Sequence, residues 1–191
     1  ALPISNTRAV DFGTGKIVLN GSTTATIFDL TTTTGLTISG TPLVECIGGG
    51  TSVTKTIILA VATEALAISF SLLETTGSVT YTFQSTSSIK NFIVNGSQTI
   101  TNAQLNIYGT FTHLTTNGTT TFSAGTNSLV LRGSSAGGAY TVNHVAGFTY
   151  DFPWNFTAGN ASTVFTLSGD LTIGSRQLSL IQGTLNLNDK T

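Results

Sequence analysis

The segment Phe92-Ile93-Val94-Asn95-Gly96 carries the pattern that decides the fold: an apolar residue, any residue, a second apolar residue, any residue and then glycine. Because successive side chains of a β-strand point to opposite faces, the pattern predicts a short strand with two inward side chains and a glycine where the chain turns. The same pattern returns as Ile17-Leu19-Gly21, Leu36-Ile38-Gly40, Leu105-Ile107-Gly109, Leu129-Leu131-Gly133 and Phe165-Leu167-Gly169. We therefore expect many short strands separated by turns.

Apolar residues alternate with Thr, Ser or Asn outside this motif as well. Such sets run from Leu66 to Leu72, from Val79 to Phe83 and from Leu105 to Phe111, and include the pairs Leu171 and Ile173, Leu178 and Leu180, and Leu185 and Leu187. No window shows the helical period with caps. The 191 residues include 38 Thr and 21 Gly, which are residues of strands and turns. We predict a single all-β unit, residues 1–191, that is one repeat or one subunit of a larger fibre.

An internal match favours a stacked architecture. The run Lys90 to Val94 is echoed by Trp154 to Ala158, and Leu105 to Ile107 is echoed, at a similar offset along the chain, by Leu171 to Ile173. Self-similarity is typical of units that bury their apolar faces against the next unit. The uneven spacing of the glycine motif predicts an irregular parallel β-helix (solenoid) of short Thr-rich strands.

An antiparallel β-sandwich of Ig-like or jelly-roll type is the alternative architecture. The pairs Asn20-Gly21, Asn95-Gly96 and Asn117-Gly118 favour it, because Asn-Gly is the strongest short signal for a hairpin between antiparallel strands. In a sandwich, Leu2 and Ile4 would belong to a strand donated to a neighbouring subunit.

Charge and hydropathy exclude several classes of protein. Seven Lys and Arg stand against eight Asp and Glu, a net charge of −1, which excludes a nucleic-acid binder that neutralises many phosphates. The longest mostly apolar stretch, Ile57 to Phe70, is too short to span a membrane. The amino end lacks the features of a secretory signal, so we expect a mature product or a piece of a longer chain. Cys46 is the only cysteine and is expected to be a small buried thiol.

A Thr-, Asn- and Gly-rich sequence pattern recurs in the runs Asn91 to Gly96, Thr99 to Phe111, Gly169 to Gly174, Leu178 to Asn188 and Ser5 to Gly15. This pattern resembles the repeats of long β-helical proteins of bacteriophage fibres and bacterial surfaces. The resemblance implies a phage fibre, adhesin or surface filament, and it implies an extracellular, cell-surface or virion location. It carries no catalytic residues, and the segment Leu43 to Thr63 departs from it.

Motifs of catalytic or metal chemistry are missing from the sequence. His113 and His144 lie far apart without metal-ligand spacing, so each is expected to be a surface or corner histidine. The eight carboxylates never fall within two residues of one another, which excludes a calcium loop of the EF-hand type. Gly13-Thr14-Gly15-Lys16 lacks the full phosphate-loop pattern and is expected to be a turn. We expect no enzyme activity, no metal and no cofactor.

An aromatic row and five sequons are the remaining candidate sites. Alternation places Phe148, Tyr150, Phe152, Trp154 and Phe156 on one side, as a stack inside the core or as an exposed surface for sugar rings. In the second case Tyr150 and Trp154 would be the first ligand contacts. The sequons at Asn20, Asn95, Asn117, Asn155 and Asn160 are expected to serve turns, and they would be the glycan acceptors if the protein is glycosylated.

Together these patterns predict a structural subunit of an extracellular filament, fibre or adhesin. Its partners would be copies of itself, joined through terminal strands that contain Leu2, Ile4, Leu185 and Leu187, because an uncovered strand edge is a template for pairing. The alternative function is a carbohydrate-binding module of a phage tail spike or fibre, with surface glycans as partners. Neither function involves nucleic acid or a membrane span.

Overall fold

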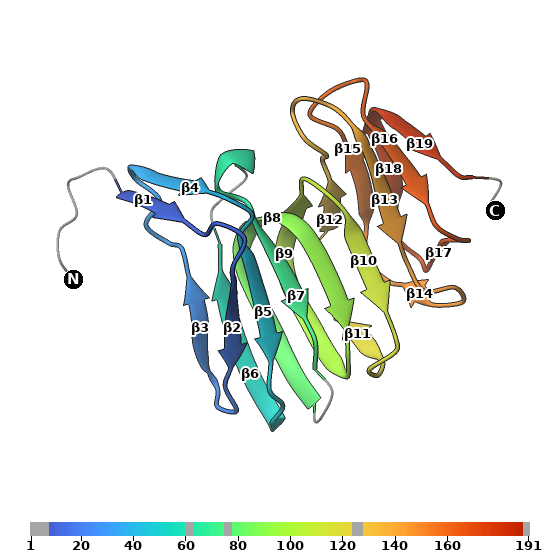
Figure 1. Ribbon diagram of the computed structural model, residues 1–191. Helices are drawn as coiled ribbons and strands as arrows, with labels where there is room; N and C mark the ends of the chain where they lie inside the picture. Colours follow the sequence, from blue (N-terminus) through green and yellow to red (C-terminus); the bar gives the residue numbers. More distant parts are fainter. Residues whose placement is uncertain (1–7, 60–62, 75–77, 124–127, 189–191) are drawn as a thin grey trace.

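Short strands wind through the whole molecule and stack side by side along its length (Figure 1). The computed structural model describes residues 8–59, 63–74, 78–123 and 128–188. The strands are β1 (Arg8–Asp11), β2 (Lys16–Asn20), β3 (Ala25–Asp29), β4 (Leu36–Ser39), β5 (Leu43–Ile47), β6 (Thr51–Ile58), β7 (Ile68–Leu72), β8 (Ser78–Asn95), β9 (Gln98–Ile107), β10 (Phe111–Leu114), β11 (Thr120–Phe122), β12 (Ser128–Leu131), β13 (Ala139–Asn143), β14 (Thr149–Tyr150), β15 (Trp154–Thr157), β16 (Val164–Leu167), β17 (Thr172–Ile173), β18 (Leu178–Gln182) and β19 (Thr184–Asn186). A 3-10 turn, η1 (Glu64–Leu66), lies between β6 and β7.

The strands form rows in which each strand pairs in parallel with the strand one coil further along the chain. Row A contains β2, β5, β7, the end of β8, β10, β13, β16 and β19. Row B contains β3, β6, the start of β8, the start of β9, and β11. Row C contains the middle of β8, the end of β9, β12, β15 and β18. Separate parallel pairs join β1 to β4 and β14 to β17.

This parallel pairing confirms the all-β prediction and supports the β-helix class over the sandwich. Every ladder between described strands is parallel, whereas a sandwich joins sequence neighbours in antiparallel hairpins. The step from one coil to the next is uneven: Ser87 pairs with Leu105, but Phe111 pairs with Val142, which is much further along the chain. Leu2 and Ile4, the proposed donated strand, lie outside the described residues.

The internal match in the sequence does not correspond to one structural repeat. Phe92 lies in row A and Phe156 in row C, so the match joins strands of different rows. The match arises because inward-facing strands of different rows need the same alternation of apolar and polar residues. The stacked architecture that it favoured agrees with the parallel rows.

The Asn-Gly pairs that favoured hairpins form corners between parallel strands instead. Asn20, Asn95 and Asn117 each stand where the chain leaves row A for row B. The Asn95 side chain accepts a hydrogen bond from the backbone N–H of Asn117, one coil further on, at 3.0 Å. Gly118 has a φ of 130°, and an added Cβ would meet Ser97, which makes glycine necessary at that corner.

A continuous column of aromatic rings fills the space enclosed by the rows. Neighbouring rings have centroids 5.4 to 6.3 Å apart, which is the usual range for aromatic contacts. The column runs through Phe28, Phe70, Phe83, Phe92, Phe111, Trp154, Phe156 and Phe165. Its members come from strands of all rows, so the inner faces of the coils share one core.

Removal of one ring from the column should strongly destabilise the fold. We predict that Phe111→Ala lowers the free energy of unfolding by roughly 3–5 kcal/mol, because it loses buried area and leaves a cavity between Phe92 and Trp154. Leu114→Ala is the matched control, since Leu114 ends the same strand but is exposed, and its cost should stay below about 1 kcal/mol. Urea denaturation followed by circular dichroism measures both values. Equal costs would contradict the column as the centre of the core.

Candidate functional site

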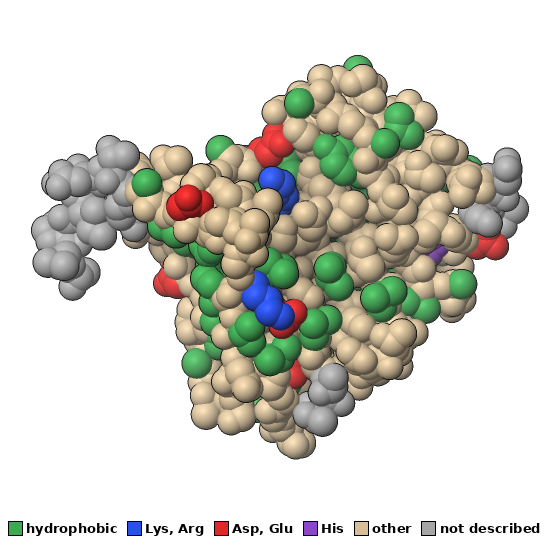
Figure 2. Space-filling model, viewed as in Figure 1, with side chains coloured by type: hydrophobic (Ala, Val, Ile, Leu, Met, Phe, Trp, Pro, Cys, Tyr) green, Lys and Arg blue, Asp and Glu red, His purple; other side chains and the backbone are tan. Residues whose placement is uncertain are grey.

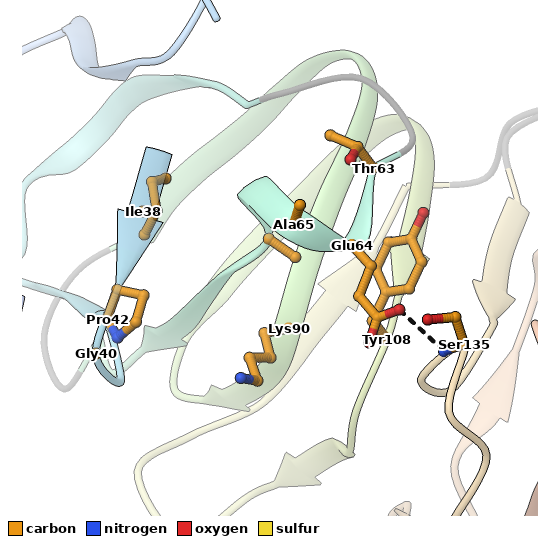
Figure 3. Close-up of a pocket in the computed structure, with 10 residues that line it drawn as sticks. Ile38, Gly40, Pro42, Thr63, Glu64, Ala65, Lys90, Tyr108 and Ser135 are labelled. Carbon is orange, nitrogen blue, oxygen red and sulfur yellow. Dashed lines mark hydrogen bonds between the residues drawn. The ribbon is translucent and has the colours of Figure 1, made fainter. Parts of the chain in front are cut away.

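A surface groove of about 640 Å³ opens beside η1 (Figure 3). The 3-10 turn contacts β4 on one side and β8 on the other, where row C would otherwise continue as a strand. A 3-10 turn advances about 2 Å per residue against about 3.3 Å in a strand, so η1 covers less of the row than a strand would. The groove lining extends from Ile38 in β4 to Ser135 after β12, and it therefore crosses several coils.

The groove brings together an acid, an amine and a phenol: Glu64 of η1, Lys90 of β8 and Tyr108 after β9. Glu64 Oε2 accepts a hydrogen bond from the backbone N–H of Ser135 at 2.9 Å. Burial raises the pKa of Glu64, but hydrogen bonds from Ser134 and Ser135 and the charge of Lys90 outweigh it and hold the pKa below its ordinary value. Glu64 is therefore a carboxylate at neutral pH.

Tyr108 gives the groove a partly exposed aromatic ring. Its burial raises the pKa of the phenol above the ordinary value, so the hydroxyl remains a hydrogen-bond donor. An aromatic face flanked by an amine and a carboxylate can hold a polar, ring-shaped ligand by stacking and by hydrogen bonds. Among the described residues of the lining, Glu64 is the only carboxylate, whereas glycoside hydrolysis ordinarily uses two, about 5–10 Å apart.

Sequence reasoning did not single out Glu64, Lys90 or Tyr108. The one local signal was the interruption of the apolar stretch Ile57 to Phe70 by Thr63 and Glu64. The groove also depends on Ser135, 71 residues further along the chain. That contact follows from the path of the coils, which no short motif specifies.

Tyr150 and Trp154, the predicted ligand contacts, are completely buried, and this corrects their assignment. Trp154 stacks on Phe152 with an interplanar angle of 15° and belongs to the aromatic column. The Tyr150 hydroxyl bonds with Nδ1 of His113 at 2.8 Å. A sugar ring cannot reach either side chain, so the prediction of an aromatic stack inside the core is confirmed.

The two histidines lie closer to the core than predicted. His113 is buried on β10, so it is not a surface histidine, and its ring contacts Phe122, Phe148 and Tyr150. Burial, with a smaller contribution from His144, lowers the pKa of His113 to about 4. His144 stands at a corner just after β13, as expected, but is also buried. Cys46 is buried as predicted, and burial raises the pKa of its thiol to about 12.

The sequons occupy different environments. Asn20 and Asn117 are exposed, whereas Asn155 and Asn160 are half-buried. Asn95 is buried, and its side chain makes two hydrogen bonds with the Thr116 hydroxyl: Nδ2 donates one and Oδ1 accepts the other. Attachment of a glycan to Asn95 would break these bonds, so Asn95 is removed from the acceptor candidates.

The end coils expose apolar side chains that the inner coils cover. Seven of the eight large apolar side chains exposed in the described residues belong to the first or last coil: Val10, Ile17, Val18, Leu178, Leu180, Ile181 and Leu187. Leu187 was a predicted assembly residue, and Leu185 is half-buried. The predicted residues at the other end, Leu2 and Ile4, are outside the described part of the chain.

Comparison of the chain with protein-family models, with curated proteins and with solved structures found no match. Among the residues that the structure describes, no helix has the length and apolar character to cross a membrane. Within the same residues, no group of three or more His, Cys, Asp and Glu side chains could hold a metal ion.

The buried His113 should make the fold sensitive to mild acid. Its pKa is about 4 in the folded chain against 6.5 ordinarily, so protonation favours the unfolded chain. The stability is fully present above pH 6.5 and falls as the pH drops from 6.5 toward 4, by about 2–3 kcal/mol in this window.

His113→Phe should flatten this pH dependence, because it keeps an aromatic ring beside Phe148 and removes the titrating group. Urea denaturation of the two chains at pH 7 and pH 4 measures the difference. The same loss of stability in both chains would contradict the assignment to His113.

Proposed function

We propose that the protein is a structural unit of an extracellular fibre, filament or surface adhesin, built as an irregular parallel β-helix whose end coils are continued by another copy of the chain. The observation that carries the proposal is the exposure of apolar side chains in the last coil. Leu178 and Leu180 of β18 pair in register with Trp154 and Phe156 of β15. The two inner residues are fully buried, but Leu178 is 43% exposed and Leu180 is 49% exposed.

The same register argument applies to the first coil. Ile17 of β2 pairs with the completely buried Val44 of β5, yet Ile17 is 37% exposed. Positions that face the core in the middle of the stack therefore face solvent at its ends. Another coil placed on either end would bury them, which favours association in proportion to the apolar area removed from water.

The backbone pairing of the end strands also supports continuation of the stack by another copy of the chain. In the described strands β18 pairs only with β15, and β19 only with β16. At the other end β1, β2 and β3 pair only with β4, β5 and β6. The outer edges offer unpaired N–H and C=O groups to a parallel strand. Because the two ends are different surfaces, they join head to tail, and when each added copy continues the stack in the same direction the result is a filament.

Charge does not oppose this association. The face shown in Figure 2 has few charged side chains, and the whole chain is only 8% charged with a net charge of −1. Copies therefore repel one another weakly. The extracellular location rests on the resemblance of the Thr-, Asn- and Gly-rich sequence pattern to fibre repeats.

Substitution of the last coil tests this function. We predict that the chain forms concentration-dependent oligomers or filaments and that Leu178→Lys with Leu180→Lys converts them to monomers, because two charged side chains would be buried without partners at positions that face the core. Leu114→Lys is the matched control, an exposed apolar residue in the middle of the stack, and should assemble normally. Size-exclusion chromatography with light scattering, and electron microscopy, measure assembly. A wild-type chain that stays monomeric at every concentration would contradict the proposal.

The groove beside η1 supports a second candidate function, binding of a surface glycan by a fibre or tail-spike module. The favouring observation is the placement of the Tyr108 ring with Lys90 and Glu64 in one groove that crosses several coils. The volume of about 640 Å³ lies in the range of pockets that hold one small ligand, so the groove has room for a short oligosaccharide segment.

Titration with neutral and acidic oligosaccharides tests this function. If a glycan binds, Tyr108→Ala should weaken it at least about tenfold, or roughly 1.4 kcal/mol, through loss of stacking. Leu114→Ala, outside the groove, should leave the affinity unchanged. Calorimetry that detects no binding of any oligosaccharide, or binding that Tyr108→Ala does not affect, would reject the groove as a glycan site.

A further inference from the structure

A lysine and a glutamate that do not line the groove face each other inside the core. Lys55 is on β6, where the alternation of the strand places it on the inward side with Val53 and Ile57. Glu74 follows β7, in the next coil. Lys55 is 1% exposed and Glu74 is 0% exposed. Burial of two charges carries a desolvation penalty that their attraction often fails to offset.

The two side chains are held in contact by a defined set of hydrogen bonds. Lys55 Nζ donates to Glu74 Oε1 at 2.9 Å and to the backbone carbonyl of Gly48 at 2.5 Å. The Tyr81 hydroxyl also donates to Glu74 Oε1. The second carboxyl oxygen, Oε2, is buried and has no hydrogen-bond partner among the described residues. An unpartnered buried carboxylate oxygen is costly and needs an explanation.

We propose that Lys55 and Glu74 condense to an amide bond within the folded chain. Lys55 first passes a proton to the Glu74 carboxylate; the freed lone pair of Nζ forms a bond to the Cδ atom of Glu74, and the bond from Cδ to Oε2 breaks with its electron pair on oxygen. Two of the three ammonium protons leave with Oε2 as one water molecule, and the third remains on the amide nitrogen. No oxidant, cofactor or other reactant is needed.

The groups around Lys55 and Glu74 satisfy the hydrogen bonds of the amide product better than those of the ion pair. The amide N–H would keep Gly48 as its acceptor, and the amide oxygen, formerly Oε1, would keep Tyr81 as its donor. The orphan Oε2 is the atom that leaves. Burial, and then the hydrogen bond to Glu74, raise the pKa of Tyr81 far above its ordinary value, so its hydroxyl stays protonated and polarises the carboxyl group.

Proximity favours the reaction over its reverse. Well-oriented groups in one molecule react as if present at about 10⁵–10⁸ M, and the apolar core favours the uncharged amide. The bond would join adjacent coils across 19 residues of chain. Because each coil of a stacked fold contacts mainly the coils beside it, such a link would hold the coil of β6 against the coil of β7. The inference is independent of the assembly proposal.

The mass of the intact, denatured chain tests the inference directly. We expect folded protein, after prolonged incubation, to be lighter than its sequence by the mass of one water molecule. Trypsin cleaves after Lys and Arg, and Lys55 is the only such residue between Lys16 and Lys90. A condensed Lys55 resists cleavage, so residues 17–90 should remain one peptide. A chain of full mass that trypsin cuts completely after Lys55 would overturn the proposal.

Variants identify the atoms involved. Lys55→Arg should restore the full mass expected from its sequence. Glu74→Gln can lose ammonia in place of water, so its condensed product should have the same mass as the condensed wild-type chain. Lys16→Arg is the matched control, because Lys16 and Glu45 form an ion pair of 2.5 Å in which Lys16 is exposed. Its water loss should equal that of the wild type, and disappearance of the loss in Lys16→Arg would also overturn the assignment.

Discussion

The contact of each inward aromatic ring with the ring of a neighbouring strand is the interaction on which the rest of the structure depends. The column from Phe28 to Phe165 connects strands of all rows, with Phe92, Phe111 and Trp154 fully buried at its middle. The outer faces are largely Thr, Ser and Asn and contribute little to burial. Parallel hydrogen bonding then fixes the distance between coils, and the rings fix which side of each strand faces inward.

A core of this kind has no natural end, and this property connects the fold to the proposed function. Each coil contacts mainly the coils before and after it, so a coil at either end leaves its inner side chains uncovered. Leu178 and Leu180 continue the row of Trp154 and Phe156 but meet no further strand in the described chain. The groove at η1 arises from the opposite situation, a place inside the stack where a strand is replaced by a shorter turn.

Much of the fold could be predicted from the sequence, because the alternation of apolar and polar residues within each short segment identifies the inward positions. The motif Phe92-Val94-Gly96 correctly identified two buried side chains and a corner. The Asn-Gly pairs misled, since the same dipeptide suits both a hairpin and a corner between parallel strands, and only the long-range pairing distinguishes them. Alternation in Thr51–Ile58 places Lys55 inward with Val53 and Ile57, but a lysine is normally assigned to the surface, so the buried pair was missed.

Less of the candidate site could be predicted. Glu64, Lys90 and Tyr108 lie on separate coils, and their distance depends on the lengths of the connections between them. The sequence left Tyr150 and Trp154 as either core residues or ligand contacts, and their complete burial places them in the core. Residue type alone could not separate the two outcomes, because the same rings suit both.

Hydrogen exchange of the end-coil amides, measured at low and at high protein concentration, tests the continuation of the stack most directly. Outer-edge amides of β18 and β19 at one end, and of β2 and β3 at the other, should exchange quickly in dilute solution. They should become strongly protected on assembly, while the amides of β8 and β9 stay protected throughout. Unchanged exchange at both ends in concentrated or filamentous material would contradict the account.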